Sequence, residues 1–312
     1  DLLIGMQAML EARRKSQCVR LEISASTSLE MRTFLQNSID VQDSDIYSIR
    51  GPLGLSDYFS LAGLRGFPKL NDANWPAQPS PEFSSAESIF QTISSGDRLL
   101  CHPYQSYDPI VQFIKAAAND PSVIAVKQTL YRTSESSEIA KALCLAAEQG
   151  KHVTVIVELK ARFDEARNIN WANELADAGV DVIYGVRGLK THAKMCLVVR
   201  REPAGIKRYV HFGTGNYNES TAKLYSDVSL FTCDEKLGRD SVHFFNAITG
   251  LSVPQTLEKL IAAPINLRES LLEMIQVETE SAARGNSAAI TAKVNSLVDK
   301  EIIDALYLAS QA

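Results

Sequence analysis

The sequence predicts an α/β protein whose main domain holds a mainly parallel β-sheet covered by helices, and three observations carry this prediction. Between residues 98 and 200, short apolar runs alternate with amphipathic helical patterns, which is the order of repeated β-α units. The apolar runs are continuous, as in strands that are buried on both faces. Gly150 and Gly179 follow two of the helical patterns, at the position where helices commonly end.

The strands and helices of this main domain alternate along the chain. The buried-type strands are predicted at Val123–Val126, Val153–Val157 and Val180–Ile183, with further strands beginning at Lys194 and Arg208. Helical spacing of apolar residues predicts three helices between the strands. Their apolar positions are Ile110, Phe113, Ile114 and Ala117 in the first, Ile139, Leu143 and Ala147 in the second, and Ile169, Ala172 and Leu175 in the third.

Segments of different character flank the main domain, which we place at residues 85–250. Residues 1–65 mix helical and extended patterns but are too few for a large domain, so we expect them to be the C-terminal part of an α+β domain. Residues 66–84 contain Pro68, Pro76, Pro79 and Pro81, which predict an extended linker. Residues 251–312 are expected to begin a further β-α domain. Its predicted elements are a helix at 267–278, a strand at 290–294 and a helix at 299–308.

Composition narrows the class of protein. The 312 residues are 45% hydrophobic and 22% charged, which is ordinary for a globular protein. The formal net charge of -5 argues against a dedicated nucleic-acid-binding protein, although a local basic pocket for a polyanion remains compatible with it. The five cysteines form no C-x-x-C pair, so a reducing compartment is expected rather than a disulfide framework. No membrane span and no signal peptide are predicted. Because the chain begins with Asp1, we expect it to be a piece of a longer protein.

Two arginines follow neighbouring predicted strands. Arg132 comes after the strand that ends near Leu130, and Arg162 after the strand that ends near Leu159. If the two strands are parallel neighbours, both arginines project from the carboxyl edge of the sheet, where open α/β sheets bind ligands. Two guanidinium groups at that edge suit phosphate oxygens. The alternative is that each arginine pairs with a nearby acid, namely Glu158, Asp164 or Glu165.

His192 and Lys194 form an H-x-K pair at the start of a predicted strand. Side chains two residues apart on a strand share a face, so the imidazole and the ammonium are expected to point the same way. An imidazole is mostly neutral at pH 7 and can attack phosphorus, and a neighbouring lysine would stabilise the charge of the transferred phosphate. The alternative is a structural histidine.

A glycine-rich turn and a tyrosine complete the candidate residues. Gly213, Thr214, Gly215 and Asn216 follow a predicted strand and could present backbone N–H groups to an anion, although glycines also make tight turns elsewhere. Tyr225 could stack on a base or pack in the core. Four further histidines show no metal-ligand spacing and are expected to be structural, and Cys196 is expected in the core. The four are His102, His152, His211 and His243.

Longer segments carry a family resemblance. The H-x-K pair followed by G-T-G-N resembles the half-site of the phospholipase D superfamily, except that Val199 stands where that pattern has an aspartate. A closer resemblance, over nearly the whole chain, is to the long, histidine-phosphorylating class of polyphosphate kinase. The segments that carry it are KQTLYRTS (127–134), VELKARFDEARNINWA (157–172), GLKTHAKM (188–195), RYVHFGTGNYNESTAKLYSD (208–227) and LVDKEIIDALYLAS (297–310).

The resemblance implies a function and roles for several residues. The family transfers the γ-phosphate of ATP reversibly to inorganic polyphosphate through a phosphohistidine, and His192 matches the phosphorylated histidine. Arg132 and Arg162 match two arginines of the phosphate and magnesium region, and Tyr225 matches a nucleotide-contacting tyrosine. Mg²⁺ is the implied cofactor. Because a guanidinium cannot ligate Mg²⁺, the arginines would reach the metal through bridging phosphate. Lys194 would neutralise charge on the phosphoryl oxygens.

The resemblance also implies an organisation and partners. Residues 1–65 would end a middle domain, 85–250 would be a first phospholipase D-like catalytic domain, and 251–312 would be the truncated start of a second. ATP or ADP and polyphosphate are the implied partners, in a homo-oligomeric, cytoplasmic full-length protein that could associate peripherally with a membrane. The family's N-terminal helical domain and most of its second phospholipase D-like domain lie outside the chain. We therefore expect the chain alone to have little or no kinase activity.

Two other functions compete with this interpretation. A phospholipase D-like phosphodiesterase or nuclease would need no ATP, but Val199 departs from its pattern. A module that binds polyphosphate or another polyanion without catalysis would form no phosphoenzyme, and the change His192→Ala would leave its binding intact.

Overall fold

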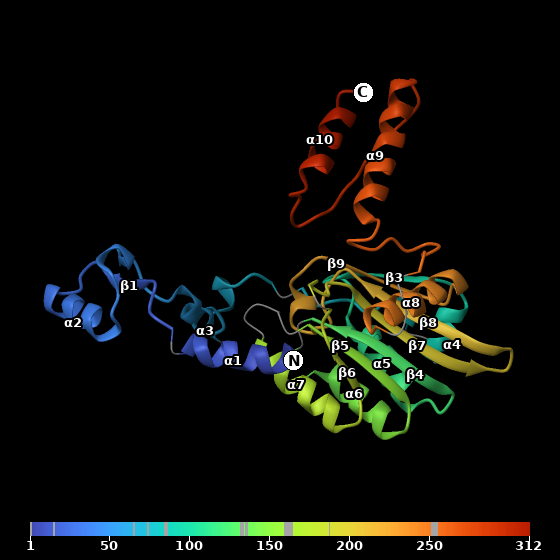
Figure 1. Ribbon diagram of the computed structural model, residues 1–312, viewed down its shortest axis with the longest axis horizontal. Helices are drawn as coiled ribbons and strands as arrows, with labels where there is room; N and C mark the ends of the chain where they lie inside the picture. The colour runs from blue at the N-terminus through green and yellow to red at the C-terminus, as the bar shows by residue number, and fades with distance from the viewer. Residues whose placement is uncertain are drawn as a thin grey trace.

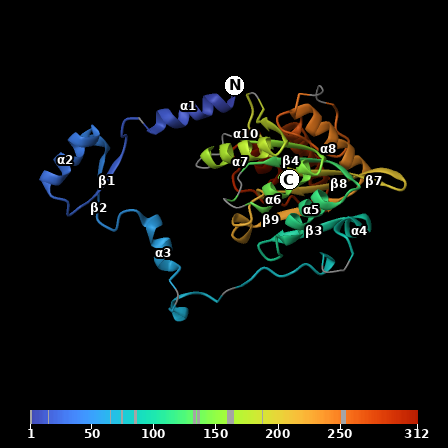
Figure 2. The same ribbon diagram turned by 90° about the horizontal axis from the view of Figure 1, so that it is seen from below.

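The N-terminal part of the chain forms a small α/β unit joined to a helix. The computed structural model describes residues 2–14, 16–64, 66–73, 75–83, 87–131, 134, 137–158, 165–186, 188–250 and 255–312. Helix α1 (Leu2–Arg14) leads to β1 (Leu21–Ser24), α2 (Leu29–Ile39) and β2 (Ile46–Ile49), and β1 pairs with β2 in parallel. In both ribbon views α2, β1 and β2 stand apart from the large sheet (Figures 1 and 2).

The proline-rich stretch contains only short helical turns among its described residues. These are the turns at Leu55–Tyr58, Pro68–Leu70 and Pro81–Phe83, with the four-residue helix α3 (Phe59–Ala62) before the prolines. Pro68 and Pro81 each begin a turn, because a proline lacks the N–H that a helix interior needs and fits its first position. The other described residues of 66–83 belong to no helix or strand, and their role as a linker stays a prediction.

The main domain is built on a seven-stranded sheet. Its strand order is β3-β9-β8-β7-β4-β5-β6. The strands are β3 (Arg98–His102), β4 (Val123–Leu130), β5 (His152–Val157), β6 (Asp181–Tyr184), β7 (Lys194–Glu202), β8 (Gly205–Gly213) and β9 (Asp227–Thr232).

Helices cover both faces of this sheet and create two cores (Figures 1 and 2). Alternate residues of one strand point to opposite cores: Val155 and Val157 of β5 pack on one side, and Ile156 between them packs on the other. The first core also contains apolar residues of α4 (Ile89–Ser94), α5 (Asp108–Asn119), α6 (Glu138–Glu148) and α7 (Glu165–Asp177). The second contains residues of α8 (Glu235–Ile248).

The sheet is mixed, which corrects the prediction of a mainly parallel one. Strands β4, β5 and β6 run parallel, but the pairs β3–β9, β9–β8, β8–β7 and β7–β4 are antiparallel. The three buried-type strands predicted at 123–126, 153–157 and 180–183 are parallel, and the error lies in the other half of the sheet. The first five residues of β7 are buried without a break, which does not reveal that β7 runs antiparallel to β4. A two-residue turn at 203–204 joins β7 directly to β8, so these two strands must be antiparallel.

The C-terminal residues form a helix pair. Helix α9 (Leu267–Ala283) packs against α10 (Lys300–Ala309), and Arg268 bridges them through Asp299 at 2.9 Å and Glu301 at 2.7 Å. This pair projects from the main domain (Figure 1). The strand predicted at 290–294 is wrong, because those residues have no neighbouring strand with which to form a ladder.

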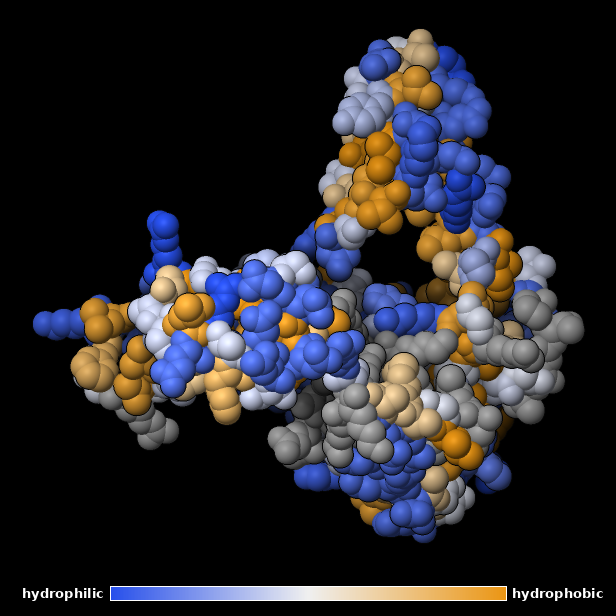
Figure 3. Space-filling model, turned by 60° about the vertical axis from the view of Figure 1, so that its left-hand side comes forward, coloured by the Kyte–Doolittle hydropathy of each residue, from blue (hydrophilic) through white to orange (hydrophobic). Residues whose placement is uncertain are grey.

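The buried core of the described chain is concentrated in the main domain. Two extensions flank this domain, namely the residues before it and the C-terminal helix pair. Both carry apolar side chains interspersed with polar ones on their surfaces (Figure 3). None of the described helices is long and apolar enough to cross a membrane. The most exposed apolar side chains of the extensions include Leu29, Phe34, Phe59, Leu70, Trp75, Val277, Val298 and Tyr307.

Candidate functional site

The ends of three strands meet at one edge of the sheet. Leu130, at the end of β4, pairs with Val157, at the end of the parallel strand β5. Strand β7 is antiparallel to β4 and begins at Lys194, next to the point where β4 ends. The structure confirms that the strands preceding the two predicted arginines are parallel neighbours. It places the H-x-K pair at the same edge.

A threonine hydroxyl fixes the start of β7. The last residue pair of the β4–β7 ladder is Gln128 with Cys196, and beyond it the two backbones separate. Thr129 bridges the gap: its hydroxyl donates to the carbonyl of Ala193 at 2.8 Å and accepts the N–H of Met195 at 3.0 Å. These two residues flank Lys194, so the buried hydroxyl of Thr129 holds the backbone of the H-x-K segment in place.

His192 and Lys194 line the same cavity. The imidazole of His192 is exposed, and its ring meets the ring of Tyr131 edge-on, with 5.4 Å between centroids. Lys194 is nearly buried, and its ammonium donates to the carbonyl of His192 and lies 5.2 Å from the centre of the Tyr131 ring. The ammonium of Lys190 lies 5.3 Å from the same ring. The ring of Tyr131 thus contacts the imidazole of His192 and lies close to two ammonium groups.

A buried glutamate supports the same segment. Glu158 directly follows β5, is 1% exposed, and accepts the backbone N–H of Thr191 at 2.7 Å. The side-chain amide of Asn168 donates to the carbonyls of Glu158 at 2.9 Å and Tyr131 at 2.7 Å. From the sequence, Glu158 is expected only as an acid that could pair with an arginine. The signal that could have found it is an acid placed immediately after a strand that ends in three apolar residues.

The glycine-rich turn closes onto strand β9. Gly213 pairs with Lys194 in the β7–β8 ladder and lines the cavity, as no other residue of the turn does. The Thr214 hydroxyl donates to Asp227 at 2.8 Å and accepts the N–H of Val228 at 3.0 Å. A Cβ at Gly215 would lie 2.4 Å from a carboxylate oxygen of Asp227, so this close approach requires glycine. A phosphate contact by this turn stays a prediction.

Asn216 and Tyr225 complete the predicted residues on this side of the site. The side-chain oxygen of Asn216 is buried and has no hydrogen-bond partner among the described residues. Tyr225 is 61% exposed on the loop before β9, and its N–H donates to the carbonyl of Thr221. The core-packing alternative for Tyr225 is therefore wrong. The tyrosine is not among the residues that line the cavity. Arg132 and Arg162 lie outside the described residues.

Two of the other histidines are held inside the fold. His211 is buried and shares a hydrogen bond of 2.7 Å with the hydroxyl of Tyr217; burial lowers the pKa of His211 to about 3. His102 contacts the hydroxyl of Ser229 at 3.0 Å, and burial lowers its pKa as well. Both rings are therefore neutral at pH 7. Cys196 is fully buried in the core, as expected.

The cavity at this edge is lined by polar and apolar residues. Its volume is about 620 Å³. Residues 190–194 and Gly213 contribute to its lining, together with apolar side chains of β8 and α8, Leu257 and residues 260–264. No carboxylate is among the lining residues, and the described part of the chain contains no cluster of three or more metal-ligating side chains. These residues do not fit a protein-held Mg²⁺ site, since Mg²⁺ prefers carboxylate, water and phosphate oxygens.

Family models of polyphosphate kinase match most of the chain. The polyphosphate kinase C-terminal domain 1 matches residues 88–254, the C-terminal domain 2 matches residues 260–312, and the middle domain matches residues 1–61. Among solved structures, the crystal structure of polyphosphate kinase from Porphyromonas gingivalis superimposes with a TM-score of 0.81 at 32% identity. It covers 94% of this chain and 45% of that one.

Curated relatives have the same name. A polyphosphate kinase of Rhodopirellula baltica is 58% identical over 312 residues, which are 100% of this chain and 37% of the relative. A polyphosphate kinase of Synechocystis sp. is 48% identical, again over 100% of this chain, and over 45% of the relative. The chain thus spans less than half the length of these relatives. Because one family model alone covers more than half of the chain, the chain belongs to the polyphosphate kinase family.

Proposed function

We propose that this chain carries the phosphohistidine part of a polyphosphate kinase, in which His192 accepts the γ-phosphate of ATP and passes it to inorganic polyphosphate. The observation that carries the proposal is the placement of the H-x-K pair. His192 is exposed in a cavity at the edge where β4 and β5 end, beside the buried ammonium of Lys194. Such an edge is where α/β sheets bind ligands.

The reaction divides into two displacements at phosphorus. In the first, the unprotonated ring nitrogen of His192 forms a bond to the γ-phosphorus, the bond from that phosphorus to the β,γ-bridging oxygen breaks, and ADP leaves. In the second, a terminal oxygen of polyphosphate attacks the same phosphorus. The N–P bond breaks, its electron pair returns to the ring of His192, and the polymer is one phosphate longer. The reverse sequence regenerates ATP.

Positive charge supplies most of the help that the protein gives to such a transfer. We propose that Lys194 neutralises the phosphoryl oxygens at His192, and that Arg132 and Arg162 do the same, since each follows a strand that ends at this edge. We assign Tyr225 to the nucleotide, because its exposed ring is available for stacking. We assign a phosphate contact to the backbone of Gly213, which lines the cavity, with Thr214, Gly215 and Asn216 as its supporting turn.

We propose that Mg²⁺ is bound by the nucleotide substrate and not by side chains of this protein. The described residues of the cavity offer no carboxylate ligand, so we assign Mg²⁺ to the phosphate oxygens of the nucleotide near Arg132 and Arg162. Neither displacement at phosphorus requires a bond between the protein and the metal. The family's second half-site would supply further groups, so we propose that the chain by itself makes little or no polyphosphate.

The experiment follows phosphate from ATP into protein and polymer. A full-length polyphosphate kinase that contains this segment is incubated with γ-labelled ATP, and acid-labile protein phosphate and polyphosphate are measured. His192→Ala is expected to abolish both. The matched control is His152→Ala, because His152 is an exposed histidine at the opposite end of β5. Labelling that survives His192→Ala would move the nucleophile elsewhere, and polymer binding without labelling of the wild type would favour a binding module.

The alternative function, a phosphodiesterase, requires an aspartate at the position where this chain has Val199. Val199 lies in β7 and packs in the core on the α8 side of the sheet. It offers no carboxylate to orient the histidine. A phosphodiesterase assay on bis-nitrophenyl phosphate checks this directly, and we expect no turnover that depends on His192.

A further inference from the structure

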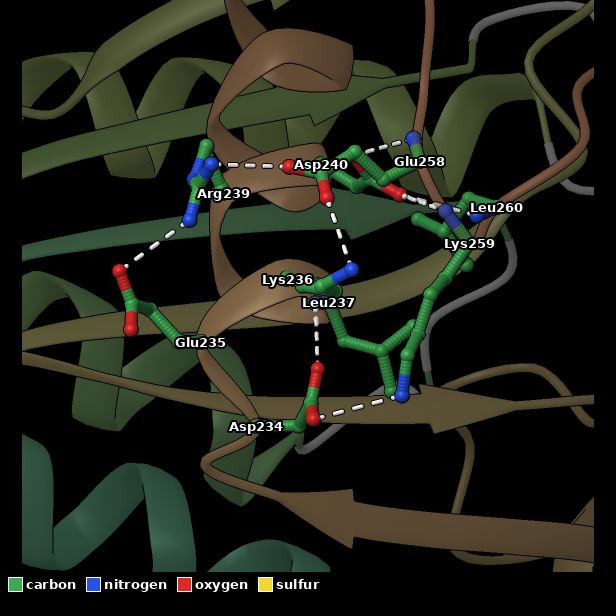
Figure 4. Close-up of polar contacts among 9 residues, drawn as sticks. All are labelled: Asp234, Glu235, Lys236, Leu237, Arg239, Asp240, Glu258, Lys259 and Leu260. Atoms are coloured by element: carbon green, nitrogen blue, oxygen red, sulfur yellow. Dashed lines mark hydrogen bonds and ion pairs between the residues drawn. The ribbon is translucent and has the colours of Figure 1, made fainter.

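Helix α8 carries a buried carboxylate that binds a distant piece of backbone. Asp240 has no exposed surface. One of its oxygens accepts the N–H of Glu258 at 2.9 Å, and the other accepts the N–H groups of Lys259 at 2.7 Å and Leu260 at 2.9 Å (Figure 4). Burial alone would raise the pKa of Asp240, but the three amides, with a contribution from His243, lower it overall. The carboxylate is therefore ionised, and both of its oxygens accept backbone hydrogen bonds.

The other links between α8 and this segment are exposed ion pairs. Arg239 contacts Glu258 at 2.8 Å, and Asp234 contacts Lys259 at 3.3 Å (Figure 4). Exposed pairs of this kind contribute little, because water screens them and the side chains lose freedom. Charge-assisted hydrogen bonds to a buried carboxylate are stronger and have a fixed geometry. Asp240 is thus the main anchor of residues 258–260.

The anchored segment forms one wall of the cavity at His192. Residues 260–264 continue directly from the anchor and line the same cavity as the H-x-K segment. Leu260 also packs in the core between α8 and the sheet. The wall is apolar, as are the neighbouring side chains of α8 that line the cavity, Phe244 and Ile248. An apolar wall beside a nucleophile displaces water from it.

We propose that Asp240 is a positioning residue that holds this wall of the cavity at His192 and so limits the access of water to the phosphohistidine. The proposal rests on the proposed function of His192. Two acceptors compete for the phosphohistidine. An oxygen of polyphosphate gives transfer, whereas a water oxygen forms the new P–O bond while the N–P bond breaks, releasing inorganic phosphate and the free ring. Because water is far smaller than the polymer, a loosened wall favours hydrolysis over transfer.

The test variant is Asp240→Asn. It keeps the shape of the side chain but replaces one accepting oxygen with an amide group that cannot accept an N–H. We expect the backbone amides of 258–260 to exchange hydrogen about tenfold faster or more, the factor that corresponds to losing one charge-assisted bond. The matched control is Asp234→Asn, the same chemical change on the same helix. It removes only an exposed ion pair and leaves a good helix cap.

The functional measurement is a ratio, in a full-length polyphosphate kinase that contains this segment. The phosphate released to water is divided by the phosphate transferred to polymer during turnover of labelled ATP. Asp240→Asn is expected to raise this ratio about tenfold, in line with the exchange rates, while Asp234→Asn leaves it unchanged. If Asp240→Asn does not fold, Ile261→Ala replaces it, because Ile261 is a partly exposed residue of the wall. It is expected to raise the ratio in the same direction.

The exchange rates and the ratio together support or overturn the role proposed for Asp240. Faster exchange with a raised ratio supports the proposal. An unchanged ratio in a wild type that synthesises polymer normally overturns it and leaves the proposed function of His192 intact. Unchanged exchange in Asp240→Asn also overturns it. A wild type in which His192 is never phosphorylated would instead remove the proposed function, and the role of Asp240 with it.

Discussion

Replacing Thr129 with valine tests how the H-x-K segment is held. Valine has nearly the same shape, so Thr129→Val removes the hydroxyl without opening a cavity. The hydroxyl makes hydrogen bonds of 2.8 Å to the carbonyl of Ala193 and 3.0 Å to the N–H of Met195, and Thr129 is 2% exposed. Each lost bond leaves a buried backbone group without its partner, at about 1–3 kcal/mol per group. For the two groups together, we expect the free energy of unfolding to fall by about 2–6 kcal/mol.

Urea denaturation measures the loss of stability, and labelling by γ-labelled ATP measures the effect on the site. Labelling of His192 in a full-length protein is expected to slow, because Ala193 is its direct neighbour. The matched control is Thr154→Val on β5, where the side chain is half-buried and the residue lies far from the H-x-K segment along the strand. We expect the control to change the unfolding free energy by less than about 1 kcal/mol. The reasoning is refuted if Thr129→Val and Thr154→Val behave alike in both assays.

Three further predictions concern the same region. Glu158→Ala leaves the N–H of Thr191 without its acceptor and is expected to slow labelling about tenfold or more; Glu158→Gln keeps an accepting oxygen and should retain most of it in the same rate assay. Gly215→Ala places a Cβ 2.4 Å from a carboxylate oxygen of Asp227, and we expect it to lower the free energy of unfolding, measured by urea denaturation, by about 1–3 kcal/mol. Adding Asp227→Ala to the same chain should restore part of this free energy. His211 has a pKa of about 3 in the folded chain, below its unfolded value of roughly 6.5, so the unfolded state takes up the proton first. Stability is therefore lost as the pH falls from about 6.5 toward 3, by up to about 1.4 kcal/mol per pH unit, and urea melts of His211→Asn should show a shallower slope.

Local pattern was enough to place most of the helices and strands of the main domain. Ile110, Phe113 and Ala117 are spaced for one helical face, and all three are buried in α5. Gly150 and Gly179 adopt φ values of 80° and 86°, the left-handed conformation expected just after a helix. Strand direction was not predictable in the same way, because burial on both faces produces the same apolar runs in parallel and antiparallel strands.

The residues proposed to do the chemistry and the residues that hold them differ in how far the sequence reveals them. His192 and Lys194 are two positions apart, so the sequence alone identifies them as an H-x-K motif. Glu158 meets Thr191 across 33 positions, and Asp240 meets Leu260 across 20, and neither pair has a local signature. Those contacts exist only because the fold brings strand ends and helix faces together. Buried carboxylates of this kind are found from the structure.

The most direct test of this account is to locate the phosphate on the protein. A full-length polyphosphate kinase containing this segment is incubated with ATP, and the acid-labile phosphoenzyme is kept near neutral pH through proteolysis and tandem mass spectrometry. We expect phosphate on the imidazole of His192, at a level that falls when polyphosphate is added as acceptor. Phosphate on any other residue, or a stable phosphate on His192 that polyphosphate does not remove, would contradict it.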